Sequence, residues 1–527
     1  MALPSVNPAA DAEMSSARAP LARVMAPLAW AAGTVALSHV PAAAHALPAL
    51  GVLRGPLGGV LVAVAIVVAA AVLLPPLRVP RVSSAALVAV AWTFLLAIGL
   101  SYTMRLRVSG DEPHYLLMAQ SLWREHDLDL RDNMAREDWR EYTPGPVTPH
   151  YAAPRADGRP FPAHSPGLPL LLAPLYALGG RTLCVALLTL MAAALAVEMR
   201  AAARSLTGDE EAALVAWSLA LGPPVAFYAF QVYTEVPSAL ALAVALRLLL
   251  SGPGVRGAAA AALLASSLPW LHMKMMPAAV ALAIVGLARL RGRPRLVFVA
   301  AAAAMAAGFL LYYRAVFGVP SPLAVYGGLP KDADGSPLRA LVGLALDRSF
   351  GLLPYAPVFV LSLAGIGALA RARAWAQAVV AVAVVAPVLS WRMWWGGQCP
   401  PARFLVPLVP VLALAAAVRV AAARRGLARW RWMLAALGVA TVVAMTMRPG
   451  ALLLLNRGDR PTRWWAALSG EWPVGRYLPS LVAPTADEWR VAVVWVVGLA
   501  VLLGLDALAQ GRDRVDRMFR GLGLPLV

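Results

Sequence analysis

Charged side chains are scarce in this sequence, and one of the two common cations is almost absent. Only 14% of its 527 residues are charged, against about 25% in an average soluble chain. Of its 46 basic residues only two are lysines, Lys274 and Lys331. Hydrophobic residues make up 60% of the chain, which is more than a water-soluble fold of this length can bury. The bilayer is therefore the solvent for most of the chain.

Other absences narrow the class of protein further. The two cysteines, Cys184 in an apolar run and Cys399 between runs, are too few for a disulfide framework. No glycine-rich phosphate loop is visible, so the sequence does not indicate a nucleotide site. No internal repeat is visible either, which counts against a transporter built from two symmetric halves. We expect no cleavable signal peptide, because Asp11 and Glu13 precede the first apolar run and no clean cleavage site follows it.

What the sequence does contain is a succession of long apolar runs. The runs 58–74 and 83–104 carry no charge at all, and about 20 such residues cross the hydrocarbon core as a helix. We therefore predict an all-α fold, a polytopic transmembrane bundle of about 12–14 helices. The predicted helices lie near residues 24–48, 56–75, 83–103, 181–200, 211–229, 234–250, 257–272, 274–290, 296–317, 353–370, 375–391, 404–422, 432–448 and 490–509.

The arginines form short clusters between the apolar runs, for example at 289–295 and 424–431. Cytoplasmic loops of membrane proteins have this composition, whereas a nucleic-acid site would show a basic face with interleaved aromatics. Placing the clusters inside predicts cytoplasmic ends at 1–23 and 510–527, around a single transmembrane domain at 24–509. The extracytoplasmic loops then lie near 104–166, 318–352, 392–403 and 449–489.

The first of these loops has structure of its own. Residues 114–124 are amphipathic at helical spacing, and we expect one or two short helices lying on the outer membrane surface. The segment 166–180 is apolar but contains three prolines, Pro166, Pro169 and Pro174. We expect it to be an interfacial or re-entrant segment that leads into the helix at 181–200.

Two adjacent carboxylates, Asp111 and Glu112, open this loop. One interpretation is structural, because Ser109 and Glu112 fit a capping box and Pro113 favours the first turn of a helix. The other is catalytic. A half-desolvated carboxylate at the boundary between lipid and water gains basicity and can take a proton from an acceptor hydroxyl or amine. The sequence leaves both interpretations open.

The pattern Asp111-Glu112-x-x-Tyr115 at the start of a long first extracytoplasmic loop resembles the GT-C superfamily of polyprenyl-phosphate-dependent glycosyltransferases. It is most similar to the branch that holds protein O-mannosyltransferases and the aminoarabinose transferases of lipid A. In that branch the first acidic residue of the motif is the catalytic base. The resemblance therefore implies Asp111 as the base and Glu112 as its supporting partner.

The resemblance extends over about residues 100–420 in scattered motifs. The segment 164–169, which begins with His164, is similar to the His/Lys-Pro-Pro element that precedes the next helix in these enzymes. The segment 233–237 resembles their acidic motif at the outer end of a helix hairpin. The stretches 347–357 and 394–403 are similar to two further segments of bacterial members. Candidate residues of the substrate pocket are then His114, Tyr115, His164 and Glu235.

Several cations are candidates for holding the phosphate of a lipid-linked donor. His272 and Lys274 are placed at the outer mouth of a helix hairpin, and Arg403 can grip a phosphate with two N–H groups. Arg348 is a weaker candidate of the same kind. Each has a structural alternative: a lysine can extend to the interface, and loop arginines can meet lipid headgroups. Glu235 is either a functional acid at membrane depth or a solvated helix end.

We expect no cofactor. His114 and His164 together with the carboxylates suggest a metal, but no two of these residues have tight ligand spacing on one element. A divalent metal is therefore possible but not indicated.

These observations favour a membrane glycosyltransferase of GT-C type in the cell (inner) membrane, with its active site facing outwards. A sugar on a polyprenyl phosphate would enter from the membrane lipid and be transferred with inversion to an extracytoplasmic acceptor (lipid, protein or glycan). The alternatives are a multi-pass transporter or lipid flippase, and a non-catalytic membrane assembly protein. A structure that gathers Asp111, Glu235, His272 and Arg403 around one cavity would favour the enzyme.

Overall fold

The computed structural model describes residues 25–73, 82–105, 108, 110–143, 145–152, 161–326, 335–371, 374–422, 428–447, 456–458, 462–470 and 472–521. Within these ranges the chain is almost wholly helical, and its extended contacts are two isolated bridges, Tyr151 with Pro162 and Cys399 with Asn456. The chain is thus an all-α, multi-pass membrane protein, as its composition predicts. Ser109, one half of the suggested capping box, lies outside the described residues, as does the N-terminal segment 1–23.

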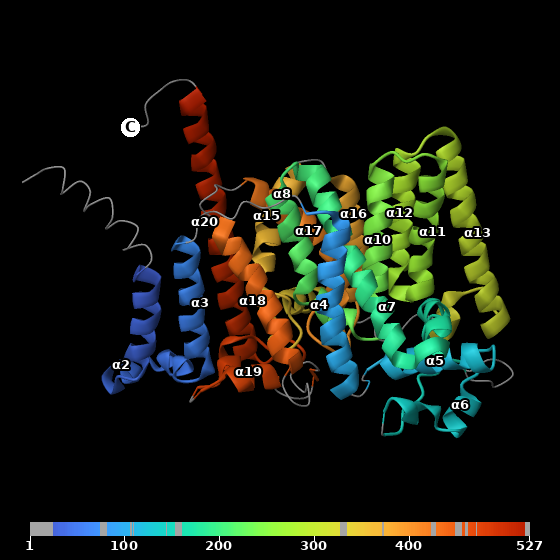
Figure 1. Cartoon of the computed structure of the whole chain (residues 1–527), viewed down its shortest axis with the longest axis horizontal. Helices are drawn as coiled ribbons and strands as arrows, with labels where there is room; N and C mark the ends of the chain where they lie inside the picture. Colours follow the sequence, from blue (N-terminus) through green and yellow to red (C-terminus); the bar gives the residue numbers. More distant parts are fainter. Residues whose placement is uncertain are drawn as a thin grey trace, which may run out of the picture.

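The helices stand side by side with their axes roughly aligned (Figure 1). The α-helices are Met25–Ser38, α2 (Pro41–Ala46), α3 (Pro56–Leu73), α4 (Ser84–Arg105), α5 (Glu112–Arg124), α6 (Arg131–Ala135), α7 (Gly167–Thr207), α8 (Glu210–Ser218), α9 (Val225–Ala229), α10 (Glu235–Leu250), α11 (Val255–Leu271), α12 (Met276–Arg289), α13 (Gly292–Phe317), α14 (Pro337–Leu346), α15 (Val360–Arg371), α16 (Trp375–Leu389), α17 (Val409–Ala422), α18 (Ala428–Met447), α19 (Arg463–Leu468) and α20 (Ala486–Gly521). Short 3₁₀ helices are η1 (Pro48–Arg54), η2 (Asp138–Glu141), η3 (Leu219–Leu221), η4 (Met273–Met275), η5 (Pro322–Tyr326), η6 (Pro357–Phe359), η7 (Arg403–Leu408) and η9 (Val474–Tyr477).

Five stretches in the described ranges are long and apolar enough to cross a bilayer unbroken: α4, α7, α13, η7 with α17, and α20 up to Gln510. The bent pair formed by η1 and the first part of α3 makes a sixth. The other predicted spans coincide with shorter apolar helices, such as the 17-residue α11 and the 15-residue α16. At 1.5 Å per residue these reach about 23–26 Å, less than the full ~30 Å core.

Prolines and glycines decide where the predicted helices break. The helix expected at 24–48 ends at Ser38, and α2 then starts at Pro41. The helix expected at 211–229 is divided into α8, η3 and α9 around Gly222-Pro223-Pro224, because proline has no N–H for the helix ladder. The proline-containing lead-in at 166–180 is itself helical. It forms the first part of α7, which breaks at Gly179 and Gly180.

The side chains of α20 show what surrounds the bundle. Val494, Leu502 and Leu508 on this helix are exposed, whereas α17 is buried along most of its length against α8, α15 and α7. A row of exposed aliphatic side chains is costly in water but not in lipid. The outer helices α13 and α20 therefore present their apolar surfaces to the membrane.

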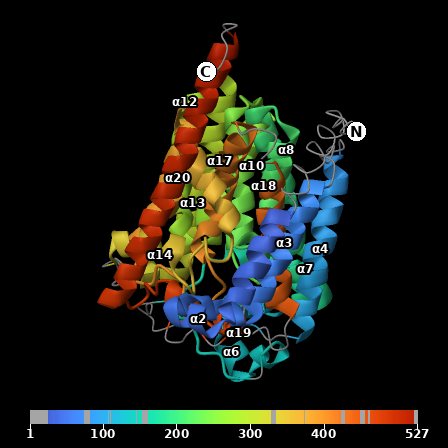
Figure 2. The same ribbon diagram turned by 90° about the vertical axis from the view of Figure 1, so that its left-hand side faces the viewer.

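The two ends of the bundle differ in their connections. α5, α6 and α19 lie together at one end, which we call the loop-rich end, while the turn from α12 to α13 and the last part of α20 lie at the opposite end (Figures 1 and 2). At that opposite end several arginines pair with acids on neighbouring helices. Arg200 pairs with Glu210, and Arg419 donates to Asp506 at 2.9 Å, which ties α17 to α20. Arginines at this end thus hold neighbouring helices together.

Candidate active site

Asp111 stands at the first turn of α5, at the loop-rich end, and it does not cap the helix. Its side chain accepts no hydrogen bond from the first turn of α5. Instead its Oδ2 atom lies 2.5 Å from NH2 of Arg403. The capping interpretation therefore fails for Asp111, and the carboxylate is directed towards a residue 292 positions away in the chain.

Arg403 is the centre of this site. Its Nε atom donates to Oε1 of Glu235 at 2.9 Å, and its NH1 atom donates to the carbonyl of Gly396 at 2.9 Å. With the bond to Asp111, the described contacts use three of the five N–H donors of the guanidinium. Only 5% of the side chain is exposed. A buried arginine held between two carboxylates has fixed geometry, and it keeps two donors that no described residue occupies.

Glu235, the first residue of α10, connects Arg403 to a second cation. Its Oε1 atom also accepts from Nζ of Lys274 at 2.8 Å, and its Oε2 atom has no hydrogen-bond partner among the described residues. The Lys274 ammonium group lies 4.0 Å from the ring centroid of Phe404. His272 accepts a hydrogen bond from the backbone N–H of Lys274 at 3.1 Å, so it caps the turn that presents this lysine.

The structure thus brings together four of the predicted site residues in one chain of contacts: Asp111, Arg403, Glu235 and Lys274. We call this set the carboxylate–cation cluster. Two carboxylates and two cations balance in charge, so the cluster is neutral as a whole when all four groups are ionised.

Tyr233 belongs to the same site, although the sequence pointed only to its acidic neighbour. The Arg403 guanidinium carbon lies 4.4 Å from the Tyr233 ring centroid, which is a cation–π distance. The Tyr233 hydroxyl also accepts a hydrogen bond from the backbone N–H of Asp111 at 3.3 Å. The tyrosine therefore contacts both members of the ion pair. Its place at the start of the 233–237 segment is the sequence signal that could have revealed it.

Glycines and one left-handed residue allow the backbone to approach this closely. Gly110 has φ +60°, and a Cβ atom there would lie 2.1 Å from the Tyr233 hydroxyl. Gly396 has φ +90°, which brings its carbonyl to Arg403, and Ala402 has φ +57° directly before the arginine. Residues other than glycine rarely adopt such φ values. The turn at 396–403 is therefore shaped to present Arg403.

Glu112 has a different role from Asp111. It is fully buried, and it accepts hydrogen bonds from the Tyr102 hydroxyl at 3.1 Å and from the backbone N–H of Val232 at 3.0 Å. Its Oε2 atom also lies 3.8 Å from NH2 of Arg181. These contacts join the start of α5 to α4, to α7 and to the segment before α10. Glu112 thus positions Asp111 and does not line the cavity described next.

A cavity of about 520 Å³ opens beside the cluster. Asp111 and Arg403 line it together with His114 and His150, and the backbone at 396–398 forms another wall. Burial alone would raise the pKa of the Asp111 carboxyl, but the Arg403 guanidinium and the nearby His164 hold it well below its usual range. Asp111 is therefore ionised at neutral pH, as a base must be.

A cluster of three histidines lies beside this cavity, and two of them, His114 and His150, line it. His114 is on α5, His150 and His164 lie on the two sides of the Tyr151–Pro162 bridge, and their ligand nitrogens are all within 4.8 Å of one another. Burial lowers the pKa of His114 to about 3 and that of His164 to about 4. Sequence spacing did not reveal this cluster, because His150 had drawn no attention and the ligands lie on different elements.

α5 is more deeply packed than a helix lying on a membrane surface. All of its residues from Glu112 to Ser121 are buried, and α5 packs along α7. Tyr115, predicted for the substrate pocket, is fully buried, and its ring lies 4.9 Å from that of His164. Tyr115 therefore supports the histidine cluster from behind.

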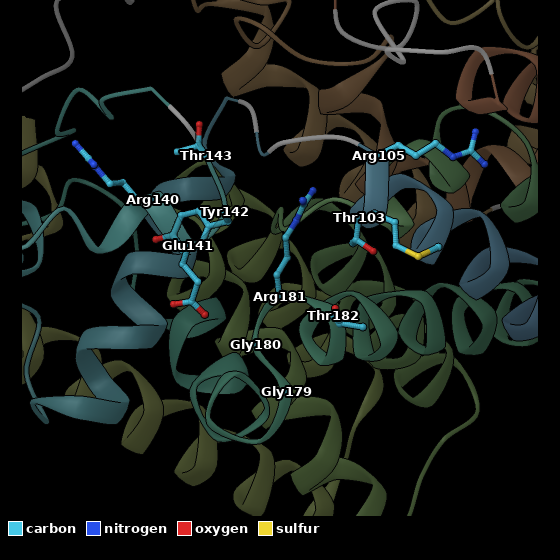
Figure 3. Close-up of a pocket in the computed structure, with 11 residues that line it drawn as sticks. Thr103, Arg105, Arg140, Glu141, Tyr142, Thr143, Gly179, Gly180, Arg181 and Thr182 are labelled. Atoms are coloured by element: carbon cyan, nitrogen blue, oxygen red, sulfur yellow. The ribbon is translucent and has the colours of Figure 1, made fainter.

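A larger cavity, of about 1070 Å³, lies on the other side of the start of α5 (Figure 3). Arg105, Arg140 and Arg181 line it, and Figure 3 shows the Arg181 guanidinium extending between the segments that carry Thr103 and Tyr142. Because Arg181 also contacts Glu112, this basic cavity adjoins the residues that position Asp111. The sequence analysis did not predict it.

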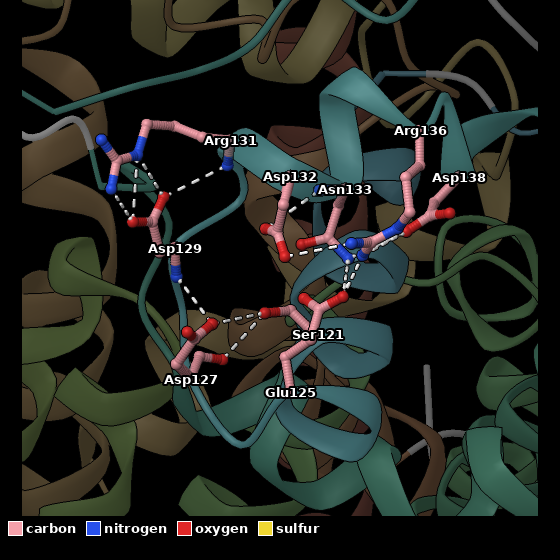
Figure 4. Close-up of polar contacts among 9 residues, drawn as sticks. All are labelled: Ser121, Glu125, Asp127, Asp129, Arg131, Asp132, Asn133, Arg136 and Asp138. Atoms are coloured by element: carbon pink, nitrogen blue, oxygen red, sulfur yellow. Dashed lines mark hydrogen bonds and ion pairs between the residues drawn. The ribbon is translucent and has the colours of Figure 1, made fainter.

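The rest of the first loop is fastened to α5 by a polar network (Figure 4). Ser121 on α5 donates to the carbonyl and the side chain of Asp127, both at 3.0 Å. Farther along, Arg136 reaches three acids. The residues of the network are Ser121, Glu125, Asp127, Asp129, Arg131, Asp132, Asn133, Arg136 and Asp138. Although exposed ion pairs contribute little individually, these contacts hold α6 in place beside α5.

Arg348 is not brought to the carboxylate–cation cluster. It follows α14, and its NH1 atom lies 3.3 Å from Oε1 of Glu488 and 3.3 Å from the carbonyl of Gly475. Its backbone carbonyl accepts from Trp465 and Tyr355. Arg348 therefore fastens the 456–489 segment to the bundle, away from Asp111 and Arg403.

No protein-family model and no curated protein sequence matches this chain. Among solved structures, the chain is similar to ArnT from Cupriavidus metallidurans, both in the apo state and bound to undecaprenyl phosphate. The identity is 17% and the TM-score 0.47, over 80–81% of this chain and 72% of that chain. It is also similar to the Archaeoglobus fulgidus oligosaccharyltransferase in the apo form, with 13% identity and a TM-score of 0.40 over 78% of this chain and 64% of that chain.

These likenesses concern the arrangement of the helices and say nothing of substrate or acceptor. The class that the structure itself defines is a multi-pass helical membrane protein with a buried carboxylate–cation cluster beside a cavity at its loop-rich end. The case for a function rests on the residues of that site.

Proposed function

We propose that this protein is a membrane glycosyltransferase that moves a sugar from a polyprenyl-phosphate donor to an extracytoplasmic acceptor, with inversion at the anomeric carbon. Asp111 is the base, and Arg403 and Lys274 hold the donor phosphate. The observation that carries the proposal is the ion pair of Asp111 with Arg403 at the wall of a cavity. The Asp111 carboxylate can take a proton there, and the Arg403 guanidinium next to it can bind an anion.

Free donor groups near the base support the phosphate assignment. Arg403 keeps two N–H groups and Lys274 keeps two, because each described bond uses only part of their capacity. A phosphodiester carries one negative charge and accepts such bonds readily. In the transition state, charge develops on the departing phosphate, and fixed cations lower the barrier where charge develops.

The low pKa of Asp111 implies an order of events. While the Arg403 charge is paired with the carboxylate, Asp111 is ionised but is a weak base. When the phosphate of the donor binds Arg403, it competes with Asp111 for the guanidinium, and the basicity of the carboxylate rises. The base thus becomes effective when the donor is in place. The freed carboxylate takes the proton of the acceptor hydroxyl or amine as that group attacks the anomeric carbon.

A lipid-linked donor fits the surroundings of the site. The cluster lies at the end of a bundle whose outer helices present apolar side chains to lipid. A polyprenyl chain can remain in the membrane while its phosphate reaches the loop-rich end. The resemblance of the 111–115 and 233–237 motifs to polyprenyl-phosphate-dependent transferases points to the same donor class.

The test is sugar transfer in proteoliposomes, using polyprenyl-phosphate sugars and an extract of envelope acceptors, with wild type against Asp111→Asn. Asparagine keeps the size and polarity of the side chain but cannot accept the proton. We expect transfer to fall by roughly 10²–10⁴-fold, the usual contribution of a general base. Insertion and abundance should be unchanged.

Asp132→Asn is the matched control, because Asp132 lies in the same loop, is half exposed, and contacts Arg136 and the backbone N–H of Asn133 but no residue of the carboxylate–cation cluster. This variant should transfer at the wild-type rate. Near-wild-type transfer by Asp111→Asn would remove the proposed base. Movement of the lipid across the bilayer without any transfer would favour a flippase instead.

The proposal also requires the loop-rich end to face outwards. The two native cysteines are buried, so a cysteine introduced at the exposed Asp132 reports orientation cleanly. We expect a membrane-impermeant thiol reagent to label this position in intact cells. Labelling only after the membrane is opened would place the site in the cytosol and contradict the proposal.

A further inference from the structure

The three histidines at the cavity form the most unusual polar group that the proposed reaction does not use. Nδ1 of His150 lies 3.3 Å from Nε2 of His164, and a ligand nitrogen of His114 is within 4.8 Å of both. The His114 and His150 rings are stacked, with centroids 3.9 Å apart. Three imidazoles this close can act together as ligands of one metal ion.

The spacing fits a metal with nitrogen ligands. Two ligands of a tetrahedral zinc ion with Zn–N bonds of about 2.0–2.1 Å are roughly 3.3–3.4 Å apart. The His150–His164 distance already has this value. His114 would need to approach by at most about 1.5 Å, because its ligand nitrogen already lies within 4.8 Å of the other two.

The backbone holds the ligands in place from three sides. His114 is in the first turn of α5, two residues from Glu112, which is fixed in the core. His150 and His164 are brought side by side because Ala163 donates to the His150 carbonyl at 2.8 Å and Ala152 donates to the Phe161 carbonyl at 2.7 Å. A preformed set of ligands loses little conformational entropy on binding.

The three rings also differ in exposure in a way that suits a binding site. His114 is buried, His164 is half-buried, and His150 is exposed. An ion can therefore enter from the solvent side, past His150. Packing alone explains a buried imidazole, but it does not explain why an exposed one is stacked onto it at the wall of a cavity.

We propose that His114, His150 and His164 form a binding site for one divalent transition-metal ion, zinc foremost. Three imidazole nitrogens favour zinc, copper, nickel or cobalt over magnesium and calcium, which prefer oxygen ligands.

Two of the three proposed ligands, His114 and His150, line the same cavity as Asp111 and Arg403, so an ion held there would have a position open to the contents of that cavity. Three protein ligands and one open position are typical of sites at which a metal meets a substrate or water. On the proposed function, this position would take an oxygen of the donor phosphate or of the acceptor. That role rests on the proposed function, whereas the metal site itself does not.

The test is zinc binding to the full chain. The protein is purified with an affinity tag that contains no histidine, and a chelator removes bound metal beforehand. Titration calorimetry with zinc chloride should show one site per chain in the wild type. His150→Gln should weaken binding by roughly 10–100-fold or more, since loss of a direct ligand exceeds the usual effect of an outer-shell change. Because His150 is exposed, this variant should fold normally, and a thermal melt checks that it does.

His126→Asn is the matched control, because His126 is exposed in the same loop and its φ of +63° suits asparagine. It should bind zinc like the wild type. A visible spectrum of the cobalt-loaded protein should show tetrahedral coordination that His114→Gln abolishes. Equal zinc binding by wild type, His114→Gln and His150→Gln, or no binding by any of them, would overturn the site.

This experiment separates the two proposals. Asp111→Asn should still bind zinc, because its carboxylate is not one of the three ligands. Zinc binding without any sugar transfer by the wild type would refute the proposed function and keep the metal site. Transfer by a wild type that binds no zinc would refute the metal site alone.

Discussion

Two Asp–Arg groups at the loop-rich end contain the same residue types but differ in what surrounds them. Asp111 and Arg403 pair with each other, and the arginine reaches on to Glu235. Asp347 and Arg348 are adjacent in the chain and do not face a common cavity. The Asp347 carboxylate accepts from the backbone N–H groups of Ser349 at 2.7 Å, Phe350 at 2.9 Å and Leu481 at 2.6 Å.

The two groups differ in how many hydrogen-bond donors they leave for a ligand. In the 347–348 group the carboxylate accepts from backbone N–H groups, and the Arg348 guanidinium binds Glu488 and the carbonyl of Gly475. Burial raises the pKa of Asp347 to about 6, and the backbone N–H groups that it accepts from offset this rise only in part. Beside Arg403, by contrast, the pKa of the Asp111 carboxyl is held low by a full positive charge. The first group fastens two segments, and the second retains donors and a cavity for a ligand.

The strongest test of the difference between the two groups is to replace each arginine in turn. Arg403→Ala should reduce transfer by at least roughly 10²–10³-fold, the usual loss for one group that stabilises developing charge. Arg348→Ala should change the rate per folded molecule by less than about threefold. The measurement is initial rate in proteoliposomes, normalised to protein that remains monodisperse.

Arg403→Ala also leaves the Asp111 carboxylate without its cation, which can destabilise the fold by about 3–5 kcal/mol. Arg403→Lys separates the two effects. It keeps the charge but loses the planar fork, so it should insert normally and remain well below the wild-type rate. Similar rates for Arg403→Lys and Arg348→Ala would erase the distinction between the two groups.

A smaller effect is expected at Lys274, which shares Glu235 with Arg403. Lys274→Gln removes one of the two proposed phosphate ligands and leaves the other. We expect about a tenfold fall in transfer, seen mainly as a higher KM for the donor, because Arg403 still holds the departing charge. A kcat that falls while KM stays constant would assign Lys274 to the transition state alone.

The smallest effect on rate is expected at Asp347, although the protein should lose stability. Asp347→Ala leaves three buried N–H groups without their acceptor, at about 1–3 kcal/mol each. We expect a thermal midpoint several degrees lower in detergent and an unchanged rate per folded molecule. A specific loss of transfer at wild-type stability would show that the 347–348 group belongs to the site.

The sequence predicted the fold well where the signal is local. The uncharged runs correspond to α3 and α4, and the helix expected at 296–317 falls within α13. It failed where a few residues interrupt an apolar run, as at Pro223-Pro224, because mean hydropathy does not register a missing N–H. It also placed α5 on the membrane surface, although α5 is buried in the protein.

The site was predicted in part. Asp111, Glu235, Lys274 and Arg403 were identified as separate candidates. Asp111 stood out at the boundary between lipid and water, Glu235 as an acid at membrane depth, and the two cations as possible phosphate ligands. Tyr233, His150 and Arg181 were missed, because tyrosine, exposed histidine and a loop arginine have ordinary structural explanations. Arg348 was the weaker candidate in the sequence, and in the structure its side chain bonds to Gly475 and Glu488 instead of joining the carboxylate–cation cluster.

The sequence by itself determined the solvent of this protein, its helical class and the kinds of groups at its loop-rich end. Each of these depends on composition and period within about 20 residues. Only the tertiary structure decided that Asp111 meets Arg403 across 292 positions, and that the ring nitrogens of His114, His150 and His164 come within 4.8 Å of one another. Contacts at such separations depend on how α5, α10 and the 396–403 turn pack together. No local pattern records that packing.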